Sequence, residues 1–383
     1  MYSGGDACGC FFMLLEARKR KNKGLSIVDK TEKVGDSREI WLDLLKVISA
    51  FFVVMIHAVG QGYKDTFGTE LWTGFLVLNV LPRFSVPAFM MISGALMLGK
   101  KVPIKKALQK TEKAVMLLFM WNVFYMLLQR MLWGSSESIW HQLAAIPVAR
   151  QFSGHLWYLY FLVWMYLFTP ILGSFYLSMS RKYRIYFVLI TLAVPGILDL
   201  YNNFFSFGGQ TLLGASQLYM APGYAGLMVL GRLLYDEISS IRYAGLIGLG
   251  LIVLGFGGAL FLTAIYCNTR HIVAEPFTPE SKIFPVLYAA GVFILAASQS
   301  AHIAQLNEAA KRFIVFLSKR AVGVYAFHCA IQWILQDITI GGIVFNRANS
   351  VPQALVCIVL YYVISVYCVS AMSKIPLIRE FVM

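Results

Sequence analysis

The feature that most constrains this chain is a run of 20 residues, 41–60, which reads WLDLLKVISAFFVVMIHAVG. A helix of this length spans about 30 Å, the thickness of the hydrocarbon core of a bilayer. Most of its side chains are apolar, yet the run contains Asp43, Lys46 and His57. Ionisable groups are costly inside a membrane unless they face a protein interior or a wet cavity, so these three are candidates for function.

The spacing of the three residues places them on one side of the helix. At about 100° per residue, Lys46 and His57 differ by three turns plus about 20°, and Asp43 lies about 40° from His57. Lys46 and His57 are separated by about 16 Å along the helix axis. This shared face predicts a functional stripe. An alternative is that Asp43 pairs with Lys46, which would make the lysine a structural partner.

Apolar runs of this kind recur along the whole chain of 383 residues, of which 58% are hydrophobic and 14% charged. Soluble domains carry about 25% charged residues. The sequence therefore predicts an all-α polytopic membrane protein with about ten transmembrane helices. The expected spans are residues 41–60, 74–98, 113–133, 155–178, 184–200, 212–235, 243–266, 282–299, 314–336 and 351–373.

Positive charge is concentrated in alternate loops. The formal net charge is +14, and 26 of the 33 lysines and arginines fall on one side of the predicted membrane. This asymmetry predicts cytoplasmic N- and C-termini and a multi-pass protein of the plasma membrane, and it explains the charge without nucleic-acid binding. We expect residues 1–38 to form a cytoplasmic arm and residues 39–383 the transmembrane domain. No P-loop, GxSxG elbow or metal-ligand spacing is present, so no metal is expected.

The second span contains Arg83 between Pro82 and Pro87. The prolines are expected to break or kink the helix. An arginine keeps its proton and needs an anion, carbonyl groups or water as partners, so Arg83 is a candidate for binding developing negative charge. The alternative is that its side chain extends to the membrane surface.

Further candidates lie in two later spans, one group at an outer end and one residue in the middle. His155 is followed by Trp157 and Tyr158, which could line an acceptor site or form an interfacial aromatic belt. His328 lies within the ninth span and could bind substrate, or be a neutral histidine that is hydrogen-bonded to a neighbouring helix.

Four sequence motifs occur together. They are Lys46 with ten residues before His57, then RFSVPAFMMISG, HLWYLY and LSKRAVGVYAFH. In this order they resemble the acyltransferase-3 family of integral membrane acyltransferases, from about Arg38 to Met372. The resemblance implies transfer of an acyl group, usually acetyl, from cytoplasmic acyl-CoA to a hydroxyl of an extracytoplasmic glycan or lipid-linked saccharide.

The resemblance also implies roles for individual residues. The family's Arg/Lys-X10-His pair maps onto Lys46 and His57, and its second-span arginine maps onto Arg83. His57 would act as general base and Arg83 would stabilise the oxyanion. Lys46 would contact the acyl-CoA donor. The reaction would use no metal, and membrane lipids would surround the protein. Two other functions fit a charged cavity: a transporter of a small polar metabolite or amino acid, and a sensor without turnover.

Overall fold

The computed structural model describes residues 38–148, 151–205, 220–336, 338–340, 343–344 and 350–382. The chain divides into two units, Met1–Arg38 and Glu39–Met383. Residues 1–37, which hold nearly all of the expected cytoplasmic arm, lie outside the described residues. The fold is therefore that of the second unit.

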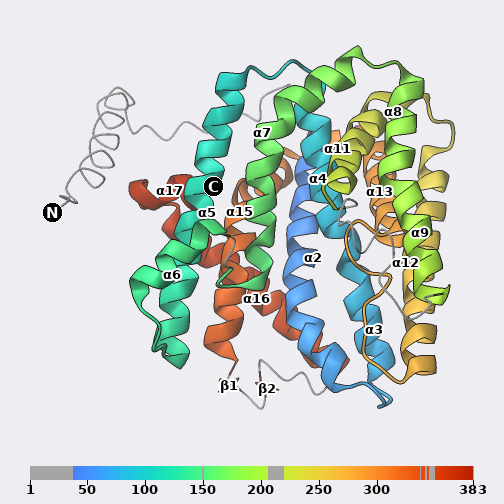
Figure 1. Cartoon of the computed structure of the whole chain (residues 1–383). Helices are drawn as coiled ribbons and strands as arrows, with labels where there is room; N and C mark the ends of the chain where they lie inside the picture. Colours follow the sequence, from blue (N-terminus) through green and yellow to red (C-terminus); the bar gives the residue numbers. More distant parts are fainter. Residues whose placement is uncertain are drawn as a thin grey trace. The chain divides into compact units, whose positions relative to one another are not determined.

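Helices make up almost all of the second unit (Figure 1). The α-helices are α2 (Ile40–Asp65), α3 (Trp72–Val80), α4 (Ser85–Met97), α5 (Ile104–Trp133), α6 (Ile139–Ala145), α7 (Trp157–Ser178), α8 (Arg181–Val188), α9 (Val194–Phe205), α11 (Met220–Glu237), α12 (Ala244–Arg270), α13 (Ile283–Ser298), α14 (Ser300–Ala304), α15 (Glu308–Leu335), α16 (Val351–Met372) and α17 (Pro376–Val382). Shorter segments are the 3₁₀ turns η1 (Leu81–Phe84), η2 (Ile146–Val148), η3 (Gly154–Leu156) and η5 (Ile238–Ser240) and the π-helical η4 (Leu189–Ala193). A hairpin of two-residue strands, β1 (Thr339–Ile340) and β2 (Ile343–Val344), lies between α15 and α16.

The predicted membrane spans agree with these helices. Within the described residues, eight helical stretches are long and apolar enough to cross a membrane, and they match eight of the ten expected spans. The other two expected spans correspond to α13, which has 16 residues, and to α11, which has 18. Residues 212–219 of the sixth expected span lie outside the described residues. The chain is thus an all-α polytopic membrane protein, and the cytoplasmic location of its ends stays a prediction.

The second span changes its helix type at its prolines. α3 passes into the 3₁₀ turn η1, which contains Pro82 and Arg83, and α4 begins at Ser85. The Ser85 hydroxyl donates to the Pro82 carbonyl at 2.7 Å, which satisfies one of the groups freed by the change. Pro87 lies in the first turn of α4, where a missing N–H is tolerated. The predicted break is therefore a local tightening that leaves the span continuous.

α4 and α11 approach each other at glycines. A Cβ atom on Gly94 would lie 1.9 Å from the Met228 carbonyl oxygen, and one on Gly231 would lie 2.2 Å from the Met91 carbonyl oxygen. Neither contact is possible for a larger residue without separating the helices. Small residues of this kind allow close van der Waals packing, which holds helices together inside a membrane. α4 is therefore fixed as one wall of the cavity described below.

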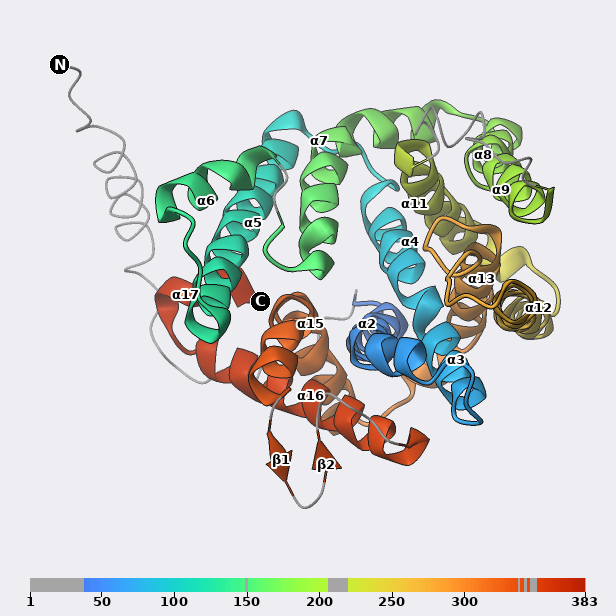
Figure 2. The same cartoon turned by 60° about the horizontal axis from the view of Figure 1, so that its bottom comes forward.

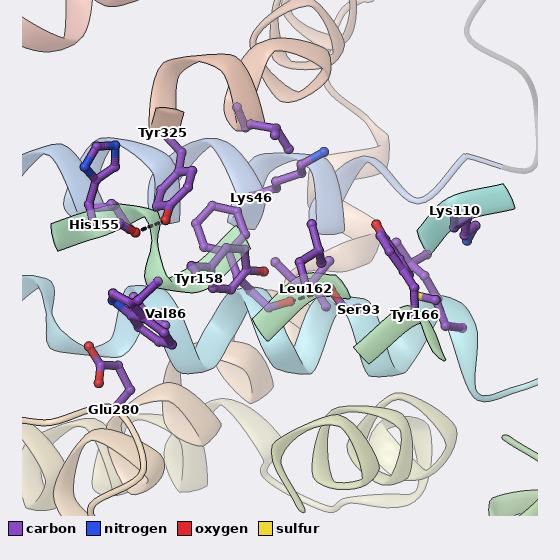
Figure 3. Close-up of a pocket in the computed structure, with 18 of the residues that line it drawn as sticks. Lys46, Val86, Ser93, Lys110, His155, Tyr158, Leu162, Tyr166, Glu280 and Tyr325 are labelled. Atoms are coloured by element: carbon purple, nitrogen blue, oxygen red, sulfur yellow. Dashed lines mark hydrogen bonds between the residues drawn. The ribbon is translucent and has the colours of Figure 1, made fainter. Parts of the chain in front are cut away.

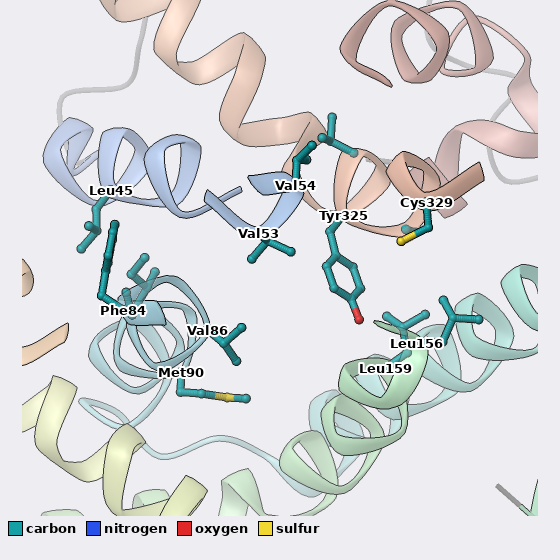
Figure 4. Close-up of a cluster of buried hydrophobic side chains, with 14 of the residues drawn as sticks. Leu45, Val53, Val54, Phe84, Val86, Met90, Leu156, Leu159, Tyr325 and Cys329 are labelled. Carbon is teal, nitrogen blue, oxygen red and sulfur yellow. The ribbon is translucent and has the colours of Figure 1, made fainter. Parts of the chain in front are cut away.

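Apolar side chains from distant parts of the sequence meet beside α2. Figure 2 shows α2, α4, α7 and α15 arranged around a common centre. Figure 4 shows Tyr325 of α15 pointing toward Leu156 of η3 and Leu159 of α7, with Val53 of α2 nearby. All four of these residues belong to one buried cluster. This packing holds in place the helices that carry the candidate site residues.

Candidate active site

A cavity of about 630 Å³ is lined mainly by α2, α4, α7 and α15. Its volume is within the range of small-molecule sites, roughly 300–1,000 Å³. Most of the middle is apolar or aromatic. Figure 3 shows Lys110 at one end and His155 and Glu280 at the other. The two ends therefore differ in chemistry, and they are called here the lysine end and the histidine end.

Lys46 and His57 both line this cavity. They come from the same face of α2, with Lys46 nearer the start of the helix and His57 nearer its end. The predicted shared face is therefore confirmed for Lys46 and His57, whereas Asp43, the third residue of the predicted stripe, is not among the described residues that line the cavity. α2 forms the wall that connects the two ends.

The lysine end is strongly basic. Five lysines line it: Lys46 from α2, and Lys100, Lys101, Lys106 and Lys110 from the α4–α5 connection and the start of α5. α5 begins at Ile104, so its N-terminal backbone N–H groups add positive potential at the same end. The Lys110 ammonium group lies 5.6 Å from the centre of the Tyr166 ring, which helps to hold it at the wall. The positive potential of the lysine end attracts anions and favours the binding of phosphate groups.

The histidine end is built from several elements. His57 comes from α2, His155 from η3, Trp157 and Tyr158 from the start of α7, and Glu280 from the loop between α12 and α13. Sequence reasoning predicted the first four of these residues as site candidates. The structure brings them together, although His57 and His155 are almost a hundred positions apart in the chain.

Three histidines form a triangle at this end. The ring centroids of His57 and His328 are 5.1 Å apart, those of His155 and His328 are 5.0 Å apart, and those of His57 and His155 are 5.8 Å apart. Each ring was a separate candidate in the sequence. Their hydrogen bonds differ and assign different roles to the three.

His155 is buried and both of its ring nitrogens are engaged. Nε2 lies 3.2 Å from the Ala326 carbonyl oxygen, which can only accept, so Nε2 carries the proton. Nδ1 then accepts from the Ser153 hydroxyl at 2.8 Å. The backbone carbonyl of His155 also accepts a hydrogen bond from the Tyr325 hydroxyl. His155 is thus a neutral ring that ties η3 to α15.

His328 is fully buried and its tautomer is also set by its neighbours. Nδ1 lies 2.6 Å from the Tyr325 carbonyl oxygen and 3.3 Å from that of Val324, so Nδ1 carries the proton. Nε2 is then an acceptor and lies 3.3 Å from the Cys329 sulfur, which can donate its thiol proton. Sequence reasoning placed His328 among the substrate-binding candidates. The structure puts it behind the wall of the cavity, in contact with His57.

His57 differs from the other two histidines. It lines the cavity and is only half-buried. Within the described part of the chain, no hydrogen bond engages either of its ring nitrogens, whereas both other rings are tied to carbonyl groups. A histidine that faces a cavity with free nitrogens can take up a proton from a bound molecule.

Arg83 is buried in η1 and holds a loop. Its Nε donates to the Asn79 carbonyl oxygen at 3.0 Å. Its Nη2 donates to Asn79 Oδ1 and to Glu275 Oε1, both at 2.8 Å, and the latter contact is an ion pair. Arg83 is not among the described residues that line the cavity. The oxyanion role therefore stays a prediction, for which Nη1 would be the donor.

The sequence that forms this site matches one known protein family. A family model described as an acyltransferase domain matches residues 39–370, which is most of the chain. The chain belongs to the acyltransferase-3 family. This acyltransferase has no match among the curated proteins or the solved structures that were compared. It is therefore a membrane acyltransferase in the general sense, as the four sequence motifs implied.

Asp43 of the acyltransferase is not among the described residues that line the cavity. Its carboxylate accepts a hydrogen bond of 2.5 Å from the Ser318 hydroxyl on α15. Lys46, three residues further along α2, lines the cavity. Asp43 thus connects α2 to α15. Its role in substrate binding stays a prediction.

One cluster in the acyltransferase has the residue types of a metal site. The ring nitrogens of His57 and His328 and the Cys329 sulfur lie within 4.8 Å of one another, although the sequence showed no metal-ligand spacing. Ligands of one zinc ion are about 3.5 Å apart, since zinc bonds are about 2.0–2.3 Å long. His328 and Cys329 are adjacent on one helix, and the thiol is 3.3 Å from the His328 ring. A thiol–imidazole hydrogen bond accounts for the closeness of His328 and Cys329, and the absence of a metal stays a prediction.

Two sets of site residues were missed in the sequence. The lysines at positions 100, 101, 106 and 110 were attributed to membrane topology alone, because charge near a membrane surface serves topology and binding equally. Glu280 was included only in a polar outer loop. An acidic residue close to the start of an apolar span, here Ile283–Ser298, was the signal available for it.

Proposed function

We propose that this membrane acyltransferase is an O-acyltransferase, in the first instance an O-acetyltransferase, of the plasma membrane. Acyl-CoA would bind from the cytoplasm and a glycan or lipid-linked saccharide would accept the acyl group on the outer side. The observation that carries the proposal is one cavity that joins five lysines to the free ring of His57. No metal is needed for this reaction.

The lysine end suits the nucleotide part of coenzyme A. That part carries several phosphate groups, and ammonium groups together with a helix N-terminus are an effective binding site for them. Figure 3 shows Lys46 between Lys110 and His155, and Lys46 lies on the same helix as His57. It is placed to contact the first phosphates or carbonyl groups of the donor.

The distance between the two ends suits the remainder of the donor. Lys46 and His57 are separated by about 16 Å along α2, at 1.5 Å per residue. The pantetheine arm is long and flexible, and largely apolar walls such as Val53, Phe89 and Leu162 would surround it. With its phosphates at the lysines, the donor can present its thioester at the histidine end.

The reaction follows from the free nitrogens of His57. The hydroxyl oxygen of the acceptor attacks the thioester carbonyl carbon while His57 takes the hydroxyl proton. The bond between carbonyl carbon and sulfur then breaks, and the proton passes from His57 to the leaving thiolate. The products are the O-acyl ester and free coenzyme A. His155 and His328 hold the walls around His57 through their hydrogen bonds.

The proposal is tested with purified protein in nanodiscs. Acetyl-CoA labelled in the acetyl group is supplied together with saccharide acceptors, and release of free coenzyme A and label in the acceptor are measured. We expect both, in equal amounts. Label that never enters an acceptor, combined with uptake of the saccharide or an amino acid into proteoliposomes, would support the transporter instead.

A further inference from the structure

We infer that Glu280 anchors an acceptor subsite at the histidine end, where its carboxylate binds hydroxyl groups of an uncharged sugar ring. The inference rests on the proposed function and names the acceptor class for the same cavity. Glu280 lines the cavity together with Trp157 and His155, and Figure 3 shows it at the same end as His155.

The carboxylate of Glu280 has unused capacity to accept hydrogen bonds. Among the described residues, no other side chain donates to it, although an ionised carboxylate can accept about four hydrogen bonds. Burial raises the pKa of Glu280 above its ordinary value, and its own backbone amide and Arg83 act in the opposite direction. A half-buried carboxylate whose remaining acceptor sites are unfilled is costly, so a ligand that brings hydroxyl groups is stabilised there.

The loop that carries Glu280 is held firmly. Glu275, five residues earlier, accepts hydrogen bonds from Arg83 Nη2 at 2.8 Å and from Asn79 Nδ2 at 2.9 Å. The Tyr63 hydroxyl donates to the Ala274 carbonyl oxygen at 2.8 Å. These contacts connect the loop to α2 and to the second span. The position of Glu280 is therefore set before any acceptor arrives, which lowers the entropic cost of binding.

Aromatic rings complete the subsite. Trp157 and Tyr158 line the same cavity as Glu280. Trp157 stacks on Tyr224 of α11 with ring centroids 5.9 Å apart and an interplanar angle of 30°, which restricts its orientation. A fixed aromatic face together with a carboxylate is suited to a sugar ring, which has C–H groups on its faces and hydroxyls at its rim. Lipid tails offer no such donors.

The charge of Glu280 also selects among sugars. It lies at the opposite end of the cavity from the five lysines, so the field favours phosphates at one end and disfavours anions at the other. A sugar with a carboxylate beside the reacting hydroxyl would be repelled. The expected acceptor is thus uncharged at the ring that receives the acyl group.

The test compares Glu280→Gln with wild type and with Glu70→Gln as a matched control. Glu70 is an exposed glutamate between α2 and α3, away from the cavity. The probes are methyl glucoside and methyl glucuronide, which differ by a carboxylate. Acceptor KM, acetyl-CoA KM and direct acetyl-CoA binding are measured separately. Glu280→Asp, which keeps the charge, is the second variant.

Wild type is expected to acylate methyl glucoside in preference to methyl glucuronide. In Glu280→Gln the KM for methyl glucoside should rise roughly 10- to 100-fold, because the hydrogen bonds lost are those to a charged group, which contribute about that much to affinity. The preference against methyl glucuronide should shrink, and acetyl-CoA binding should stay unchanged. Glu280→Asp should keep the preference even if its stability falls, and Glu70→Gln should match wild type.

Three results would overturn the inference. Active wild type with an unchanged acceptor KM in Glu280→Gln would remove the subsite and leave the proposed function standing. Wild type that acylates neither probe but acylates another alcohol would overturn the acceptor class. Wild type that binds acetyl-CoA and transfers the acyl group to no acceptor would overturn the proposed function and, with it, the subsite.

Discussion

The two ends of the cavity differ in where their residues come from. The lysine end is formed mainly by one short stretch around the start of α5, with Lys46 added from α2. The histidine end combines α2, η3, α7 and the loop before α13, and His328 of α15 supports it from behind. A local cluster of charge can be exchanged residue by residue, whereas a site assembled from distant segments depends on the whole fold. Changes at the two ends should therefore have separable effects.

The largest effect is expected for His57 at the histidine end. His57→Gln keeps a polar side chain but cannot take up a proton, so turnover should fall by about 10²- to 10⁴-fold. Acetyl-CoA binding, measured by titration calorimetry, should be preserved because the lysine end is unchanged. Turnover within a few-fold of wild type would exclude His57 as the base.

Arg83→Lys tests whether the histidine end depends on its loop. Lysine keeps the charge but loses the planar fork that contacts both Asn79 and Glu275. We expect kcat/KM for the acceptor to fall roughly 10- to 100-fold, mainly through a higher acceptor KM. A fall in kcat at unchanged acceptor KM would favour the oxyanion role instead.

Neutralising the lysine end should affect the donor alone. In the triple variant Lys100→Gln, Lys106→Gln and Lys110→Gln, the acetyl-CoA KM should rise about 10-fold at low salt, and less at high salt. The acceptor KM should not change. Lys113→Gln is the matched control, because Lys113 is exposed and pairs weakly with Glu380 at 3.8 Å. If Lys113→Gln raised the acetyl-CoA KM as much as the triple variant does, the lysines would attract the donor by general electrostatics and would not form a binding site.

The smallest effect is expected at His155. Both of its ring nitrogens are engaged by Ser153 and Ala326, so it has no nitrogen to offer a substrate. His155→Ala should lower thermal stability and reduce turnover only a few-fold. A loss as large as that of His57→Gln, in protein with unchanged melting behaviour, would place His155 in the reaction itself.

Sequence reasoning succeeded where the signal was local. Apolar runs long enough to cross a bilayer predicted the spans, and the helix period predicted the common face of Lys46 and His57. The histidine and aromatic residues at a membrane edge indicated His155, Trp157 and Tyr158 as separate candidates. These properties follow from a few consecutive residues and the geometry of one helix.

The rest depended on contacts between distant segments. Nothing local indicated that Arg83 would pair with Glu275, 192 positions away, or that His328 would lie against His57. The hydrogen bond from Ser318 to Asp43 likewise joins residues 275 positions apart. The lysines of α5 looked like topology signals because topology and phosphate binding require the same charge.

The most direct test of the central claim uses proteoliposomes in which the protein has one known orientation. Acetyl-CoA is supplied only on the side of the lysine end and the saccharide acceptor only on the other side, and O-acetylated saccharide is measured. A cavity that connects donor and acceptor across the membrane predicts product on the acceptor side, none with His57→Gln, and none when both substrates are on the acceptor side. Product formed only when donor and acceptor share one side would contradict it.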